Sequence, residues 1–207
     1  MYLLSYFEMQ HLDSHASDVY GRPTFVDRVF GAPSDAQMRA RPAKGVNSLV
    51  WLLWHMARTE DVAVNLVVSA GSQVLDDAWA RRMNVPGCDM GSGMTDDEVD
   101  DLTARADIAA VRAYRSAVGL RTREVVRALR PEAWDEIIGE TEIARLATAM
   151  GQDHRDPVFR DYRPGQEHPW LGVPRARRLS SAAVGHNRVH LGEAVTISGL
   201  AGFGGGA

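Results

Sequence analysis

Two histidines near the end of the chain, His186 and His190, stand four residues apart. In a helix this spacing places both side chains on one face, one turn apart, where they can bind a common metal ion. Apolar residues between Leu179 and Ile197 follow the same face, which predicts that both imidazoles point toward the core. From the spacing alone, two ordinary core histidines that each make a hydrogen bond explain the pair equally well.

A third histidine, His55, favours the metal-binding alternative. It borders the inward stripe of the most apolar window in the chain, residues 49–68. A helical bundle can bring such a residue opposite a pair on another helix. Three neutral imidazoles are the protein ligands of an open catalytic zinc, nickel or iron site. The sequence therefore predicts one metal site formed by His55, His186 and His190.

The residues next to the histidine pair limit which reactions the candidate site could catalyse. Asn187 follows His186 at the position where the zinc-protease motif has a glutamate as general base, so a protease is excluded. Glu193 lies one turn beyond His190 on roughly the same face and is the candidate catalytic residue. It can orient a ligand, accept a proton or act as a further ligand. An ion pair with a nearby arginine is an equally good interpretation of Glu193.

Other residues that could do chemistry carry weaker signals. His11, His15, His154 and His168 lie in segments without clear periodicity, and we expect them at the surface. Although His11 and His15 are four apart, their polar surroundings argue against a buried site. Cys88 lies in a glycine-rich segment with no histidine beside it, which disfavours a role as nucleophile. As the only cysteine, it excludes an intramolecular disulfide and a zinc site built from thiolates.

The polar and aromatic residues around the first predicted ligand are assigned structural roles. Arg58, Glu60 and Asp61 follow it within two turns, and we expect them to form ion pairs. Trp51 and Trp54 are expected to pack in the core rather than to stack on a ligand.

The elements that must position these residues are helices, because strand signals are weak throughout and apolar residues repeat at helical spacing. In the first half of the chain we expect a partial helix within residues 14–30, broken by Gly21 and Pro23, and a long helix from Asn47 or Ser48 to about Ser69. A short helix should begin at Asp96, behind a capping box of Thr95 and Glu98. Further helices are expected over residues 104–129 and within 134–150, and a last one, capped by Ser180 or Ser181, should end near Gly199.

Four principal helices with a long crossover predict an all-α fold, a four-helix bundle with an extra short helix and long loops. Residues 31–42 and 156–174 are expected to be connectors, and the glycine-rich residues 89–94 a turn or a lid rather than an anion site. We expect a single domain over residues 1–207, because 207 residues of which 45% are hydrophobic can bury one substantial core. The glycine-rich tail from about Gly199 is expected to be flexible.

Charge and hydropathy exclude two classes of partner. The net charge is −4 with both signs interspersed, so no basic face is offered to nucleic acid. Residues 49–68 contain too many polar groups for a membrane span, and residues 1–10 lack the features of a signal peptide. We expect a cytoplasmic protein that acts on a small molecule and forms a homodimer through exposed apolar faces.

Three passages together resemble the DinB/YfiT-like family, also described as the thiol-dependent S-transferase superfamily. They are residues 46–61 (VNSLVWLLWHMARTED), residues 31–42 (GAPSDAQMRARP) and residues 186–199 (HNRVHLGEAVTISG). The resemblance implies that His55, His186 and His190 hold a divalent metal, often nickel or zinc. Many members have a glutamine at the position of Glu193.

The resemblance also implies a class of reaction. Members with assigned activities use a low-molecular-weight thiol, such as mycothiol, bacillithiol or glutathione, for S-transfer or isomerisation. A bound metal would lower the pKa of such a thiol, or of a water, and direct it at an electrophile. Lys44 is the only lysine among 23 basic residues, a bias typical of GC-rich coding sequences that slightly favours mycothiol. The alternatives are a non-catalytic, stress-related metal-binding bundle, and histidines that bind nothing and only pack.

Overall fold

The computed structural model describes residues 2–85, 87, 89–150 and 163–203. Within these residues the secondary structure is helical, apart from an isolated antiparallel bridge between Ile137 and Pro174. The prediction of an all-α fold is confirmed. No helix in this part of the chain is long and apolar enough to cross a membrane.

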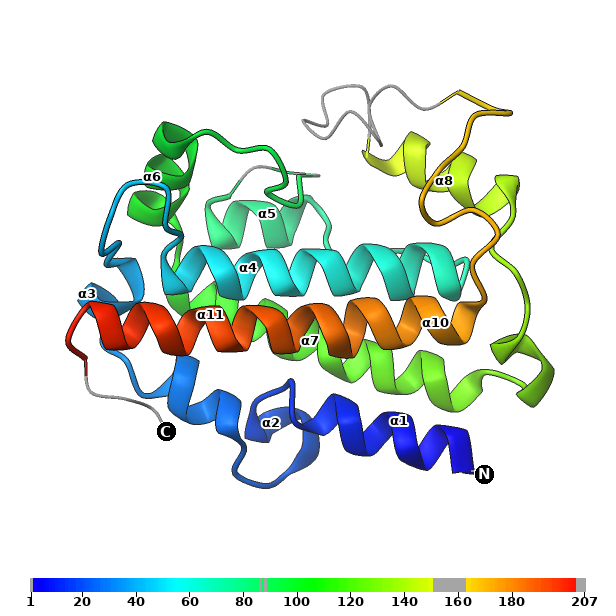
Figure 1. The fold of residues 1–207 in the computed structure, drawn as a ribbon, viewed down its shortest axis with the longest axis horizontal. Helices are drawn as coiled ribbons and strands as arrows, with labels where there is room; N and C mark the ends of the chain where they lie inside the picture. Colours follow the sequence, from blue (N-terminus) through cyan, green and yellow to red (C-terminus); the bar gives the residue numbers. More distant parts are fainter. Residues whose placement is uncertain (1, 86, 88, 151–162, 204–207) are drawn as a thin grey trace.

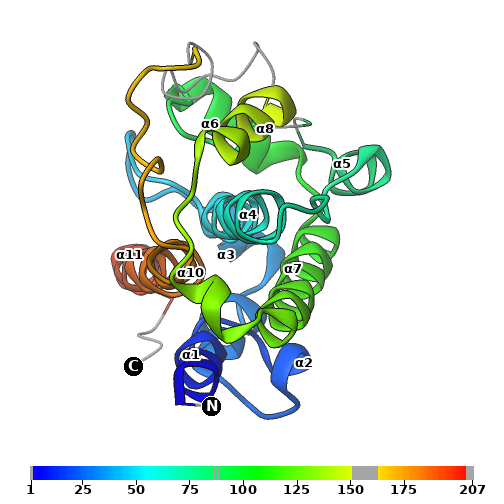
Figure 2. The ribbon, with the colours of Figure 1, turned by 90° about the vertical axis from the view of Figure 1, so that its right-hand side faces the viewer.

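The long helices lie side by side, as the two views at right angles show (Figures 1 and 2). Their buried apolar residues form three clusters. Helix α4 is central, with α7 and the last helical rod on either side and α1 below. The bounds are Tyr2–Leu12 for α1, Leu49–Glu60 for α4 and Ile108–Ala128 for α7. The π-helical η2 (Asp61–Val68) continues α4. The last helical rod is one continuous run of α10 (Arg175–Leu179), the π-helical η4 (Ser180–Gly185) and α11 (His186–Leu200).

Short helices fill the connections between these long ones. They are α2 (Ser17–Tyr20), the π-helical η1 (Asp27–Gly31), α3 (Asp35–Arg39), α5 (Asp77–Met83), α6 (Asp96–Arg105), the 3-10 turn η3 (Pro131–Trp134) and α8 (Glu140–Met150). In Figure 1, α5 and α6 lie above one half of α4, and α8 lies above the other half.

The central helix forms as its sequence predicts. The Ser48 hydroxyl accepts a hydrogen bond from the backbone N–H of Trp51, which satisfies a free donor of the first turn. Trp51 and Trp54 are buried in the main core cluster, as expected. The sequence allows either Asn47 or Ser48 to cap this helix, and the structure shows that Ser48 does.

The charged residues of the central helix form the expected buried ion pairs. Arg58 lies 3.2 Å from Asp61, and Asp61 also accepts a hydrogen bond from the Tyr114 hydroxyl at 2.6 Å. Asp61 further accepts the backbone N–H groups of Val74 and Leu75, so it ties the loop after η2 back to the helix. Burial of these charges is tolerable because each has a partner.

The prediction of a first helix within residues 14–30 is wrong in its bounds. Residues 14–30 contain only α2 and η1, separated around Gly21 and Pro23, whereas the unpredicted α1 precedes them. Tyr2 and Tyr6 of α1 are 94% and 62% exposed, so the apolar residues of this helix do not follow one buried stripe. The periodic pattern that reveals a helix in a sequence is therefore missing from α1.

The last helix begins earlier than predicted. It starts at Arg175, directly after Pro174, and Ser180 and Ser181 lie inside the continuous rod without capping it. Proline is well tolerated at the start of a helix because its missing N–H costs no hydrogen bond there. The predicted end near Gly199 agrees with the observed Leu200. Residues 204–207 of the tail are outside the described residues.

Three further boundaries differ from the predictions. The α6 capping box of Thr95 and Glu98 is confirmed, but α7 begins at Ile108 rather than at residue 104, because Asp107 caps it. Of the predicted helix within residues 134–150, only α8 (Glu140–Met150) forms, because residue 134 ends the preceding turn η3. The helix α5 is one that the sequence pattern does not predict. The described part of the predicted loop, residues 163–174, contains no helix.

Candidate metal centre

The three predicted ligands come together between two neighbouring helices. His55 belongs to α4, and His186 and His190 belong to α11, which lies alongside it (Figure 1). The Nε2 atoms of His55 and His186 are 3.1 Å apart, and one ring nitrogen from each of the three residues lies within 4.8 Å of the others. The ring centroids are 4.5 to 4.9 Å apart.

The His55 ring is held on two sides. Its Nδ1 lies 2.5 Å from the carbonyl oxygen of Met90, and because a carbonyl only accepts, Nδ1 carries the proton. The Nε2 lone pair therefore faces His186. The Trp51 ring stacks on His55 at a centroid distance of 4.7 Å.

Gly91 explains why a glycine-rich segment stands at this place. A Cβ at Gly91 would lie 2.8 Å from both Trp51 and Trp54, and the residue has a φ of +91°, which L side chains rarely adopt. Only glycine lets the chain approach the two tryptophans so closely, and this approach puts the Met90 carbonyl against His55. The expected turn is confirmed, but its role in orienting His55 has no signal in the sequence.

Glu193 orients the His190 ring as the Met90 carbonyl orients the His55 ring. Its Oε2 lies 2.7 Å from His190 Nδ1, while its Oε1 accepts a hydrogen bond from the Asn47 side chain at 3.2 Å. A carboxylate at Nδ1 favours the tautomer whose Nε2 lone pair is free, which is a frequent arrangement behind metal-bound histidines. The predicted orienting contact is present, and within the described part of the chain Glu193 contacts His190 and forms no ion pair with an arginine.

Burial keeps two of the imidazoles neutral. It lowers the pKa of His55 to about 4, even though the hydrogen bond to Met90 opposes the shift. Burial and the nearby His55 and His190 lower the pKa of His186 to about 3. At neutral pH both rings are therefore uncharged, and each has one nitrogen whose lone pair can bind a metal ion.

The donor set fits a divalent transition metal. Two nitrogen ligands on one zinc ion, each with a bond of about 2.05 Å, are about 3.3 Å apart in tetrahedral geometry. The observed 3.1 Å between the Nε2 atoms of His55 and His186 is close to that separation. Imidazole nitrogens suit zinc, nickel, copper and iron, and three of them leave coordination positions open.

A second cluster lies where none is expected from the sequence. His11 and His15 are fully buried, and their Nε2 atoms lie 2.8 and 3.0 Å from the carboxylate of Glu60. The prediction that both histidines lie at the surface is wrong. The segment is polar by composition, but these rings lie between α1 and α4 with Glu60 as their common partner. A single chain segment cannot reveal that partner.

The Glu60 carboxylate is already fully bonded. Besides the two histidines, it accepts hydrogen bonds from Arg115 at 2.7 Å, Thr122 at 2.7 Å and Asn187 at 2.9 Å. Burial alone would raise its pKa, but His15, Arg115 and His11 outweigh that effect and hold the pKa well below its usual range. We call Glu60 and these five donors the Glu60 hub. With a guanidinium against it, the hub is a structural network rather than a second cation site.

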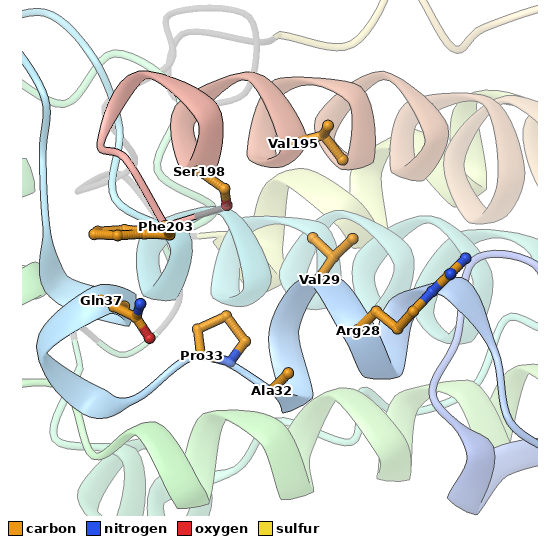
Figure 3. A pocket seen from close by; sticks show the side chains of 8 residues that line it. All are labelled: Arg28, Val29, Ala32, Pro33, Gln37, Val195, Ser198 and Phe203. Atoms are coloured by element: carbon orange, nitrogen blue, oxygen red, sulfur yellow. The ribbon is translucent and has the colours of Figure 1, made fainter. Parts of the chain in front are cut away.

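The remaining candidates lie elsewhere. His168 is buried rather than exposed, in the loop before α10, so that prediction is wrong too. Cys88 and His154 are outside the described residues. A cavity of about 280 Å³ opens between η1, α3 and the end of α11, but Arg28, Gln37 and Ser198 are its main polar groups and none of the three histidines lines it (Figure 3).

Comparison with known proteins adds the family. Residues 26–194 match the family model described as the DinB superfamily. This span includes His55, His186, His190 and Glu193, but it excludes α1. A search of curated proteins finds no match.

Proposed function

The chain belongs to the DinB superfamily, and from that premise we propose that it is a cytoplasmic metal-dependent enzyme that activates a low-molecular-weight thiol, or water, toward a small electrophile. The observation that carries the proposal is the convergence of His55, His186 and His190. Two of these rings have an acceptor at Nδ1, and two are kept neutral by burial. Side chains arranged in this way are ready to bind a metal before it arrives.

We assign the metal as zinc or nickel. A divalent ion bound by three imidazoles supplies Lewis acidity that makes a thiol or a water a good nucleophile at neutral pH. The residues of the chain would do the rest. His55, His186 and His190 would hold the ion, and Met90 and Glu193 would fix two of the rings.

Glu193 is our candidate for moving the proton. Its side chain is 33% exposed, so one of its oxygens can reach solvent or a bound substrate, whereas Glu60 is sealed in the core. As a carboxylate beside a ligand ring, Glu193 would accept the proton that the thiol or water loses. The arginine-rich composition makes mycothiol the first thiol to test.

The test combines elemental analysis with a thiol-transfer assay. Native protein is analysed for zinc, nickel and iron; metal-loaded and metal-free protein are then mixed with mycothiol, bacillithiol or glutathione and monochlorobimane, and thioether formation is followed. We expect about one ion per chain and faster transfer only with the metal-loaded protein. His186→Ala should lose both properties.

Equal transfer rates with and without metal, across the three thiols and with water as nucleophile, would overturn the enzyme proposal. If the ion is nevertheless bound stoichiometrically, the protein is a non-catalytic metal-binding bundle. If no ion is bound and His186→Ala changes nothing, the histidines only pack.

A further inference from the structure

Asn187 lies directly after the ligand candidate His186 and is fully buried. Its side-chain Nδ2 donates two hydrogen bonds, one to Glu60 at 2.9 Å and one to the Ala183 carbonyl of its own helix at 2.9 Å. Glu60 stands five residues after His55 on α4. One hydrogen bond therefore joins the two helices that carry the three histidines, close to the histidines themselves.

The turn of α11 that carries the two histidines has no buried apolar side chain of its own; the apolar residues that pack this rod lie before it, at Ala183 and Val184, and after it, at Leu191 and Ala194. Between Gly185 and His190, Asn187 is the only buried residue, and Val189 is 69% exposed. A smooth apolar surface would let the helix turn, but a hydrogen bond to a rigidly held carboxylate is directional. Glu60 is rigidly held because α1, α7 and the turn before α2 also donate to it through His11, Thr122, Arg115 and His15.

The geometry points to a positioning role: we propose that the hydrogen bond between Asn187 and Glu60 sets the rotation of α11 against α4, and so holds His186 and His190 opposite His55. The inference rests on the proposed metal centre for its purpose, but its structural content stands without the metal.

The magnitudes support this role. A histidine nitrogen lies about 6 Å from its helix axis, so a rotation of about 20° moves it by about 2 Å. Metal–ligand bonds tolerate errors of only about 0.2 Å. A rotation of this size would therefore dismantle the site, and within this turn Asn187 is the buried polar contact that opposes it.

A matched pair of substitutions separates positioning from stability. Asn187→Leu removes the hydrogen bond at nearly constant volume, and Thr122→Val removes another hydrogen bond to the same carboxylate from α7, which carries no ligand. Asn187→Ser, whose hydroxyl lies one bond nearer the backbone and so falls short of Glu60, is the second variant if Asn187→Leu does not fold. Folding is checked by circular dichroism and urea unfolding.

Two readouts are measured on each variant. The first is the affinity for cobalt(II) and its visible absorption spectrum, which reports coordination geometry. The second, on metal-free protein, is the set of nuclear Overhauser effects between the ring protons of His55 and His186, whose centroids are 4.9 Å apart. We expect Asn187→Leu to weaken cobalt binding by about 10- to 100-fold, to change the spectrum and to lose the ring-to-ring effects. Thr122→Val should stay within about threefold of the wild-type affinity and keep the effects.

The outcomes are distinguishable. If Asn187→Leu, or Asn187→Ser in its place, keeps the ring-to-ring effects, Asn187 does not position the histidines and the inference is overturned. Equal losses in Thr122→Val would also overturn it, because they would show a general loss of stability. If the wild type binds no metal but only the Asn187 variant separates the rings, the proposed function fails and the positioning role survives.

Discussion

The Nε2 atoms of His55 and His186 approach to 3.1 Å across 131 positions of the chain. Neither ring can donate to the other without giving up a lone pair at the centre of the cluster, since His55 already carries its proton on Nδ1. A shared cation would use both lone pairs, whereas without one His186 has to donate its Nε2–H to His55; the first prediction tests which of the two arrangements holds.

The protein is expected to bind one divalent ion per chain, not two. His186→Ala should weaken zinc affinity by more than about 100-fold, since changes to the residues behind the ligands alone cost about 10- to 100-fold. His15→Gln, a change in the Glu60 hub, serves as the control and should leave the affinity close to that of the wild type. Competition with a chromophoric chelator measures both, and a second equivalent of ion that disappears in His15→Gln would contradict the assignment of the hub as structural.

Glu193→Gln is expected to keep most of the zinc affinity, whereas Glu193→Ala should lose about 10- to 100-fold. The reason is that a glutamine oxygen can still accept the hydrogen bond from His190 Nδ1. The same variants examine proton transfer: Glu193→Gln should slow thioether formation even at saturating metal. Full activity in Glu193→Gln would remove the catalytic role and leave only the orienting one.

Gly119→Ala should destabilise the fold, although alanine normally stabilises a helix interior by about 1 kcal/mol. A Cβ at Gly119 would lie 2.4 Å from His15 Nδ1 in a fully buried site, so the overpacking should cost about 1 to 3 kcal/mol. Gly192→Ala on α11 is the matched control, because a Cβ at Gly192 would meet nothing within 4 Å. Urea unfolding of metal-free protein should show opposite signs for the two changes, and a gain of stability in Gly119→Ala would refute the close packing of His15.

Acid should destabilise the protein through the Glu60 hub. Burial, with help from Arg115, lowers the pKa of His15 from 6.5 to about 3. Between these values the unfolded chain binds a proton that the folded chain does not, so stability falls as the pH drops below 6.5. One such group contributes at most about 1.4 kcal/mol per pH unit. The depressed pKa of Glu60 acts in the same direction at lower pH.

His15→Gln isolates this contribution, because every other buried histidine is still present. Its free energy of unfolding, measured in urea at pH 7, 6 and 5 without metal, should fall less steeply with acid than that of the wild type. Parallel pH profiles would show that His15 does not titrate in this window.

The convergence of the three histidines is predictable from the sequence, and the contacts that hold them are not. Local periodicity places His186 and His190 on one helical face and His55 in a strongly patterned apolar helix, whereas the expectation that the three meet comes from the bundle architecture and the family resemblance. The partners of His55 and His190 depend on Gly91 and on the rotation of α11, which are tertiary properties.

The Glu60 hub shows where sequence reasoning stops. Glu60 is expected in an ion pair, and it has one with Arg115. Its histidine partners lie more than forty positions upstream, one in α1 and one just after it. Because tyrosines of α1 are exposed, this helix has no periodic apolar stripe in its sequence. Burial of polar residues against one distant carboxylate leaves no periodic trace, so the sequence wrongly places His11 and His15 at the surface.

The placement of α1 has a practical consequence for anyone who would shorten this protein. The family match begins at residue 26, so an expression boundary drawn there would look natural. It would also remove the two imidazoles that donate to the buried carboxylate at position 60, and it would expose to water the side of the bundle that α1 covers. The segment that lies outside the shared family span is part of what makes this particular chain fold.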